Sequence, residues 1–417
     1  MATHTQSDRR IRQTFLPYSA PSIGEEEIAE VVDSLRSGWI TTGKKVQLFE
    51  RAFADYLAAT HAIAVSSCTA GLQIALAALG IGPGDEVVIP TLTFCSTANV
   101  VVQLGARPVL VDVRDDFNID PESVEAAITP RTRAIIPVHY GGQPCDLHAI
   151  YALADRRGLA VIEDAAHAVG SSYFGNKIGS DRLSVGCGNF NRVTVFSFYA
   201  NKNMTTGEGG MITTAHPQLA EHMAALRLHG MNRDAWSRYT ASGSWYYEVY
   251  AAGYKANMTD LQAALGIHQL HKLDRFVETR QNHARLYNLA FSQNPTIQAP
   301  LRHTDRTHAY HLYVIRLGLD RLRIDRAQFI NELTKSNIGT SVHFIPVHLH
   351  PFYQQRYQYK RGDLPNAERL YDRIVSLPIY PGMSPRDVQD TIAAVRQIAA
   401  ENLSESFDKV PLSVNRE

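Results

Sequence analysis

Short apolar segments alternate with amphipathic stretches between about residue 61 and residue 270. Each apolar segment is bounded by turn-forming or polar residues, and the stretches between the segments repeat apolar side chains at helical spacing. This pattern predicts an α/β fold in which helices cover both faces of a parallel sheet. The predicted strands are residues 61–67, 86–90, 108–113, 134–139, 160–164, 193–198 and 211–214, and the predicted helices are 69–79, 96–104, 122–128 and 147–157.

The pattern changes after about residue 275, beyond a short apolar helix predicted at 261–270. A chain of 417 residues exceeds what one core normally encloses, so we expect two domains. A long helix (270–291), a strand (312–317), a helix (325–335) and a strand-like segment (340–344) predict a smaller α+β domain beside the sheet. The expected division is a flexible N-terminal arm at 1–15, a large domain at 16–275, a small C-terminal domain at 276–402 and a polar tail at 403–417.

The charge balance limits the partners that the chain can attract. Lysine and arginine together number 41, as do aspartate and glutamate, so no global field attracts nucleic acid or an anionic membrane. Any anion site must therefore be local.

Residues 1–14 are polar and basic, and no run reaches the roughly 18 apolar residues of a spanning helix, so we expect a soluble cytoplasmic protein. The cysteines are widely spaced, which favours reduced thiols over disulfides or a zinc site: Cys68, Cys95, Cys145 and Cys187.

Several chemically active side chains fall at or just beyond predicted strand ends. Ligands bind at the carboxyl ends of the strands in parallel sheets. One pocket could therefore collect Cys68, Phe94, His139, Asp164 and Ser197.

Lys202 stands between two asparagines in the polar turn that joins the last two predicted strands. A desolvated lysine amine can attack a carbonyl, so one interpretation is a Schiff-base lysine that holds an aldehyde cofactor. The alternative is a solvated loop lysine, which is the more frequent role of a lysine in a polar turn.

Three further features are consistent with such a cofactor. Residues 66–71 (SSCTAG) join a strand to a helix, where N–H groups and the Thr69 hydroxyl suit a phosphate, although an ordinary helix cap has the same pattern. Phe94 could stack on a flat ring or pack in the core. Asp164 needs a cationic partner if it lies in a crevice, and a protonated pyridine nitrogen would be such a partner. His167 could then face the phenolic oxygen of the same ring. The alternative for Asp164 is a helix cap.

Five motifs together resemble the DegT/DnrJ/StrS family of PLP-dependent sugar aminotransferases. They are SSCTAG, PTLTF, VIEDAAHAVG, FSFYANKNMTTGEGG and GYKANMTDLQAALG, and the resemblance extends over roughly residues 15–400. It implies the aspartate-aminotransferase-like fold (fold type I), with a mostly parallel mixed sheet between helices. It also implies pyridoxal 5′-phosphate (PLP) as the cofactor and a homodimer with shared active sites.

The resemblance implies a role for each matching residue. Lys202 would form the internal aldimine, Asp164 would pair with the pyridinium nitrogen, and His167 would lie near the ring oxygen. The remaining cofactor contacts would be ring stacking by Phe94, phosphate binding by Thr69, Ala70 and Ser197, and a phosphate contact from Asn257 across the dimer interface.

The candidates for substrate contact rest on weaker signals. Trp39 and Thr41 lie in the loop SGWITTG, which could wall a pocket or form a plain turn. His343 belongs to a segment that faces the substrate entrance in similar enzymes, and core packing is the alternative. The candidates for a nucleotide diphosphate, or else solvated surface charges, are Lys255, Arg233 and Arg238.

The implied reaction is a ping-pong transfer of an amino group from L-glutamate to a nucleotide-linked keto-sugar in polysaccharide biosynthesis, with Lys202 carrying the proton. Within the family, FLPYSAPSIGEEEI, SGWITTG and IIPVHYGG most resemble the enzyme that aminates a UDP-4-keto-pentose to UDP-4-amino-4-deoxy-L-arabinose.

Ala256 and residues 199–201 depart from the family pattern near the expected substrate mouth. A dTDP- or GDP-linked sugar, or amination at C3, therefore stays open. A PLP-dependent dehydratase would carry histidine in place of Lys202. The remaining alternative is a PLP-binding regulatory protein without turnover.

Overall fold

The main sheet has seven strands in the part of the chain that the computed structural model describes, which is residues 12–184, 191–231 and 246–404. The strand order is β1-β9-β8-β5-β4-β2-β3. Strand β9 runs antiparallel to β1 and β8, and the other pairings are parallel, which confirms a mostly parallel mixed sheet. The strands are β1 (His61–Val65), β2 (Glu86–Pro90), β3 (Arg107–Val111), β4 (Thr132–Ile135), β5 (Ala160–Asp164), β8 (Arg192–Ser197) and β9 (Gly210–Thr214).

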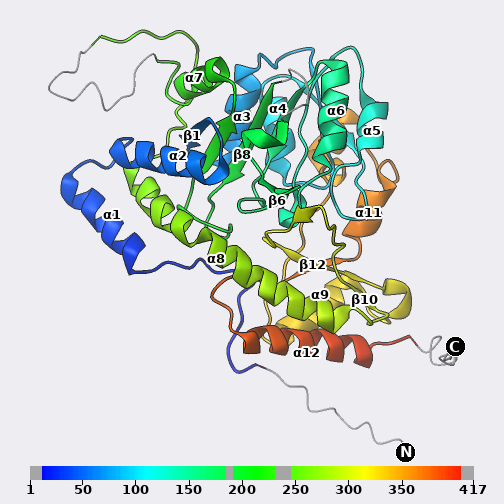
Figure 1. Cartoon of the computed structure of the whole chain (residues 1–417). Helices are drawn as coiled ribbons and strands as arrows, with labels where there is room; N and C mark the ends of the chain where they lie inside the picture. The colour runs from blue at the N-terminus through cyan, green and yellow to red at the C-terminus, as the bar shows by residue number, and fades with distance from the viewer. Residues whose placement is uncertain (1–11, 185–190, 232–245, 405–417) are drawn as a thin grey trace, which may run out of the picture.

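Helices cover both faces of this sheet, as predicted (Figure 1). Side chains alternate along each strand, so neighbouring residues of β5 enter different cores. Val161 packs in the core under α2, α5, α6 and α8, whereas Ile162 packs in the core under α3, α4 and α7. The helices that precede the long helix α8 are α1 (Glu25–Ser37), α2 (Lys44–Leu57), α3 (Cys68–Ala78), α4 (Cys95–Gln103), α5 (Pro121–Ala127), α6 (Leu147–Arg157) and α7 (Pro217–Leu226).

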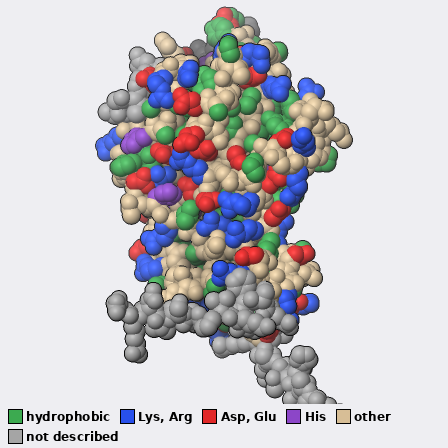
Figure 2. Space-filling model, turned by 90° about the vertical axis from the view of Figure 1, so that its right-hand side faces the viewer, with side chains coloured by type: hydrophobic (Ala, Val, Ile, Leu, Met, Phe, Trp, Pro, Cys, Tyr) green, Lys and Arg blue, Asp and Glu red, His purple; other side chains and the backbone are tan. Residues whose placement is uncertain are grey.

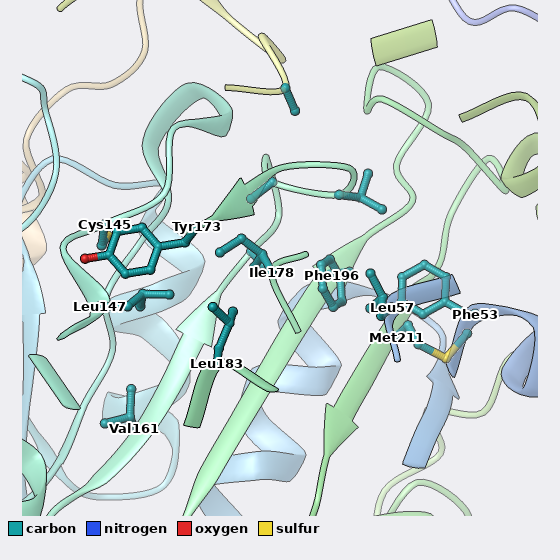
Figure 3. Packing of buried hydrophobic residues seen from close by; sticks show 14 of the residues in the cluster. Phe53, Leu57, Cys145, Leu147, Val161, Tyr173, Ile178, Leu183, Phe196 and Met211 are labelled. Carbon is teal, nitrogen blue, oxygen red and sulfur yellow. The ribbon is translucent and has the colours of Figure 1, made fainter. Parts of the chain in front are cut away.

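Aromatic side chains fill the core between α2 and the sheet. Phe53 of α2 and Phe196 of β8 lie in the cluster that Figure 3 shows. The Phe53 ring makes edge contacts with the rings of Phe196, at 5.2 Å, and of Phe198, at 5.5 Å. This packing fixes the end of β8, from which the turn with Lys202 begins.

Helix α8 (Asp260–Phe291) is a single helix of 32 residues. The sequence predicted two segments, 261–270 and 270–291, and a domain boundary after residue 275 that falls inside this helix. The N-terminal part of α8 packs on α1 and α2, whereas its C-terminal side chains Ala284, Tyr287 and Phe291 belong to the core of the C-terminal region. The apolar stripe changes its packing partner while the helix continues. The division into two domains stays a prediction.

The C-terminal region has a three-stranded antiparallel sheet in the order β10-β12-β13. The prediction of a strand-like segment at 340–344 was wrong, because these residues contribute only an isolated bridge between Ser341 and Ser376. Its next residues, His343 and Phe344, line a cavity instead. The elements here are β10 (Ile297–Gln298), β12 (Tyr313–Leu317), α9 (Arg326–Lys335), α10 (Pro351–Tyr357), α11 (Pro365–Tyr371), β13 (Ile374–Leu377) and α12 (Pro385–Glu401), and a third sheet joins β11 (Arg306–Thr307), β6 (Ser172–Tyr173) and β7 (Asn176–Lys177).

Most of the predicted arm and tail lies outside the described residues, as does Cys187. The described end of the arm is tied to the fold, because Arg12 pairs with Asp387 and Asp390 of α12.

Positive and negative side chains are interspersed over the face in Figure 2. No helix of the described chain is long and apolar enough to cross a membrane. Within the same residues, no group of three or more His, Cys, Asp or Glu side chains is placed to hold a metal ion.

We expect Phe53→Ala to lower the thermal unfolding midpoint strongly. The Phe53 side chain is fully buried, and truncating a buried phenylalanine leaves a cavity that costs about 3–5 kcal/mol of unfolding free energy. Far-UV circular dichroism during heating measures the shift. Leu48→Ala, on the same helix but at a position that is 50% exposed, is the matched control and should shift the midpoint little. Equal shifts in the two variants would contradict this account of the core.

Candidate active site

A cavity of about 470 Å³ lies at the carboxyl ends of β5 and β8. It brings together most of the side chains that the sequence singled out, which come from loops and strand ends far apart in the chain. The predicted residues that line it are Cys68, Thr69, Phe94, Asp164, His167, Ser197, Lys202 and His343. Lining residues that the sequence analysis missed are Thr93, Ser96, Glu208, His311 and Phe344.

Lys202 lies in the turn that follows β8. The turn is closed by a hydrogen bond from Lys202 N to Tyr199 O, at 3.0 Å, and by one from Thr205 Oγ1 to Phe198 O, at 3.1 Å. Burial lowers the pKa of Lys202 to about 8, although the charge of Asp164 acts in the opposite direction. Roughly a tenth of the amine is therefore neutral at pH 7, far more than for an exposed lysine. The solvated-loop alternative does not describe this side chain.

Asp164 ends β5 and is held by donors from three segments. Thr97 Oγ1 of α4 donates to Oδ2 at 2.8 Å, and Ala166 N donates to Oδ1 at 3.1 Å. The Cys68 thiol lies 3.9 Å from Oδ1. Burial raises the pKa of Asp164, against the opposing effects of Thr97, Ala166 and Lys202. A cation bound against this carboxylate would stabilise its ionised form.

His167 presents a neutral imidazole to the same cavity. Gly141 N donates to its Nδ1 at 3.3 Å, so in the neutral ring the proton resides on Nε2. The Phe344 ring stacks on it at 5.8 Å, and the His311 ring lies 4.4 Å away. Burial, and then the charge of Lys202, lower the pKa of His167 well below its ordinary value. The ring is therefore a hydrogen-bond donor through Nε2.

The first turn of α3 forms another part of the cavity wall. Ser67 caps this helix, because its Oγ accepts a hydrogen bond from Ala70 N at 3.1 Å. The hydroxyl-bearing residues Thr69 and Ser197 line the cavity beside it. Ala70 is absent from the described lining, so its predicted phosphate contact has less geometric support than those of Thr69 and Ser197.

Phe94 and His343 lie on the cavity wall. The Phe94 side chain is 57% exposed, which excludes core packing, and its ring lies 5.9 Å from that of Phe344. His343 Nδ1 is 2.8 Å from Ser376 Oγ. Burial, and then the charge of Lys202, lower the pKa of His343 to about 4, so this ring is neutral as well.

His139 does not join the cavity, contrary to the prediction. Its Nδ1 accepts a backbone N–H, so Nε2 donates to Glu163 Oε2 at 3.0 Å. Arg192 Nε and Tyr151 OH donate to the other oxygen of Glu163, at 2.5 and 2.6 Å. Burial would raise the pKa of Glu163, but the charge of Arg192 and the bond with His139 prevail and lower it to about 2. Because strand neighbours point to opposite faces, this network lies across the sheet from Asp164.

Four predicted residues lie together, and none of them is among the described residues that line the cavity. Trp39 Nε1 donates to Thr42 O at 3.0 Å, and Asp260 N donates to Thr41 O at 3.0 Å. Asn257 Nδ2 donates to Thr42 Oγ1 at 2.6 Å, and Lys255 Nζ bonds Asn257 Oδ1. Within one chain, these four residues therefore form a cluster that does not line the cavity, although Asn257 pairs with Val65, two residues before Ser67 of the cavity wall. Arg233 and Arg238 lie outside the described residues.

Comparison with known proteins identifies relatives over nearly the whole chain. Residues 21–396 match the DegT/DnrJ/EryC1/StrS aminotransferase family. The spore coat polysaccharide biosynthesis protein SpsC of Bacillus subtilis is 53% identical over 389 residues, which are 93% of this chain and 98% of that protein. The PLP-form structure of the putative sugar aminotransferase Spr1654 from Streptococcus pneumoniae has a TM-score of 0.85 at 31% identity, covering 94% of this chain and 100% of the other. Helicobacter pylori PseC, an aminotransferase involved in the biosynthesis of pseudoaminic acid, has a TM-score of 0.84 at 29% identity, covering 93% and 100%.

The mixed sheet and these structural relatives define a PLP-dependent transferase of fold type I. The chain belongs to the DegT/DnrJ/EryC1/StrS aminotransferase family. It is thus a PLP-dependent sugar aminotransferase, as its motifs predicted.

We expect the Lys202 amine of the cofactor-free protein to titrate with a midpoint near pH 8. Only the neutral amine reacts with an acylating reagent, so labelling of Lys202 should rise as the pH passes through this value. Asp164→Asn should move the midpoint to lower pH, because the carboxylate stabilises the ammonium form. Competitive acetylation with trace acetic anhydride, read by mass spectrometry, measures the midpoint.

Lys272 is an internal control for the labelling experiment. It is ion-paired with Glu26 and Glu27, far along the chain from Asp164, so its labelling should be the same in both proteins. A Lys202 midpoint that does not move in Asp164→Asn would contradict the inferred electrostatics.

Proposed function

We propose that this enzyme transfers the amino group of L-glutamate to a nucleotide-linked keto-sugar, with a UDP-linked 4-keto-sugar as the substrate. The observation that carries the proposal is that Lys202 shares one cavity with Asp164 and His167. SpsC is a protein of spore coat polysaccharide biosynthesis and PseC acts in the biosynthesis of pseudoaminic acid, which supports an amino-sugar product for a polysaccharide. A cytoplasmic location stays a prediction.

The donors of the cavity suit PLP. The pyridine nitrogen would meet the Asp164 carboxylate, Phe94 would stack on the ring, and the His167 N–H would face the phenolic oxygen. The hydroxyls of Thr69 and Ser197 and the first turn of α3 would hold the phosphate, since helix N-termini favour anions. When bound, PLP supplies an aldehyde that accepts the amino group and a ring that withdraws electrons.

Lys202 and Asp164 would then divide the chemistry between them. Nζ of Lys202, once free, would take the proton from Cα of glutamate and deliver it to the carbon that carries the cofactor's aldehyde, which its low pKa favours. The carboxylate of Asp164, which Thr97 and Ala166 fix, would keep the pyridine nitrogen protonated. His343 and Phe344 would form the wall that the C-terminal region contributes to this site.

The cluster of Trp39, Thr41, Lys255 and Asn257 would complete the site of a neighbouring subunit in a homodimer. Asn257 would donate to the cofactor phosphate of the partner, and Lys255 would neutralise a nucleotide phosphate. None of the four side chains is among the described residues that line the cavity of its own chain, which supports the arrangement. Hydrogen bonds hold the polar side chains of this cluster in place, and a dimer with shared sites would give these side chains a role.

Two spectroscopic steps test the proposed reaction. Adding L-glutamate to the holoenzyme should convert the absorbance of the PLP form to that of the pyridoxamine form. UDP-, dTDP- and GDP-linked keto-sugars are then tested for the reverse change, and NMR of the product distinguishes amination at C3 from amination at C4. Conversion only with dTDP- or GDP-linked sugars would overturn the UDP assignment. No conversion with any amino donor would favour the PLP-binding regulatory protein.

Asp164→Asn should keep PLP bound but lower the rate of the glutamate half-reaction on the order of 100-fold, because an amide cannot stabilise the pyridinium charge. Thr97→Val is the matched comparison, since it removes one hydrogen bond and keeps the carboxylate, and it should cost about tenfold. Stopped-flow absorbance measures both rates. If Asp164→Asn were the faster of the two variants, Asp164 would not be the partner of the ring nitrogen.

Mixing two inactive proteins tests the shared sites. Lys202→Ala should abolish transamination in a folded dimer, and Asn257→Glu should do the same by placing a negative charge against the partner's phosphate. After subunit exchange, heterodimers of the two variants should regain one working site each. Lys202→Ala mixed with itself is the control and should stay inactive. No recovery after exchange has been verified by mass spectrometry would count against a shared site.

A further inference from the structure

A second cavity, of about 430 Å³, lies between the C-terminal half of α8 and residues 302–310. It is separate from the cofactor cavity, although one segment of chain serves both: His308 and Tyr310 line the second cavity, and His311 lines the first. Its volume is in the range of small-molecule sites. Most of its side chains are cationic or carry amide groups, among them Arg285, Arg302, Arg306, Gln143, Gln281 and Asn288.

Two of the basic groups around this cavity are neutralised by acidic neighbours. Arg306 forms a two-point ion pair with Asp305, with the shorter contact at 2.6 Å, and donates to a backbone carbonyl. His303 Nε2 lies 3.0 Å from Asp116 Oδ2. These pairs add structure to the wall but little net charge.

Two arginines are not neutralised in this way. Arg285 donates to the neutral side chain of Asn282, and no carboxylate of the described residues pairs with it. Arg302 has no hydrogen-bond or ion-pair partner in the described part of the chain. Burial of His308 lowers the pKa of its imidazole to about 3, and the positive charge of Arg302 acts in the same direction. Two guanidinium groups therefore leave a positive surplus in this cavity, in a chain whose formal net charge is zero.

The amides of the wall add neutral donors to this charge. Asn288 Oδ1 accepts a hydrogen bond from Tyr313 OH at 2.9 Å, which leaves its amide N–H groups as donors. Guanidinium groups with several N–H donors bind phosphate oxygens in a fork geometry, and a pair of them suits two linked phosphates. Carboxylate ligands offer fewer acceptor oxygens for the same number of donors.

We propose that this cavity binds a small ligand with two linked phosphate groups, through Arg285 and Arg302. The site is additional to the cofactor and substrate sites of the aminotransferase, and it does not depend on the identity of the sugar. Both arginines are exposed, so the ligand reaches them from solvent.

Inorganic pyrophosphate is the probe, titrated into the PLP-loaded enzyme by isothermal calorimetry at constant ionic strength. We expect saturable binding of one pyrophosphate per chain. The double variant Arg285→Gln/Arg302→Gln should bind tenfold more weakly or worse, because it loses two charge-assisted contacts. Arg275→Gln, which removes an exposed arginine from the same helix, is the matched control and should stay within twofold of the parent.

The absorbance of bound PLP and the thermal midpoint verify that the double variant keeps its fold and its cofactor. Pyrophosphate could also enter the substrate mouth of the active site. Binding there would be equally tight in the double variant, and that result overturns the proposal. The absence of saturable binding by the parent enzyme overturns it as well.

Discussion

The arrangement of this active site depends on two adjacent carboxylates at the carboxyl end of a buried strand. Glu163 and Asp164 are consecutive on β5, so the alternation of a strand points them to opposite faces of the sheet. Burying a carboxylate is costly unless charges or hydrogen bonds compensate. Glu163 is compensated within the chain by Arg192, His139 and Tyr151. Asp164 is held by the neutral groups of Thr97 and Ala166 N, and its cationic partner is expected to be the ring of the cofactor.

Desolvation shifts the pKa of four titratable groups of this cavity in the direction of their neutral forms. It lowers the pKa of Lys202, His167 and His343, and it raises the pKa of Asp164. Lysine and histidine therefore become proton acceptors or neutral donors near neutral pH, which acid–base chemistry requires. The same burial that makes the lysine amine nucleophilic thus makes the carboxylate dependent on a positive charge. The two effects favour one arrangement, with a neutral amine beside an ion pair of carboxylate and cofactor.

Much of the fold and of the cavity could be predicted because both follow the strands. Phe94, Asp164 and Ser197 were found at strand ends, where a parallel sheet places its ligands. Thr97 was missed because it lies inside a helical pattern, and His311 and Phe344 were missed because they reach the cavity from the C-terminal region. His139 was misplaced because a strand end does not reveal which face its side chain takes. The continuous α8 was divided because its apolar stripe changes partners midway. The contributions of a second subunit concern contacts outside one chain, so they stay predictions.

The cluster outside the cavity has its own physical basis. Asp260 begins α8, and its carboxylate accepts N–H groups of Gly43, at 2.8 Å, and of Val46, at 3.0 Å, at the start of α2. One side chain thereby joins the N-termini of two helices and fixes the loops before them, which carry Trp39 and Asn257. The backbone N–H groups of Gly43, Lys45 and Val46 are thereby satisfied within the chain, so these loops present fixed side chains rather than free helix N-termini. In the proposed dimer, a phosphate would therefore meet the first turn of α3 from one chain and the side-chain amide of Asn257 from the other.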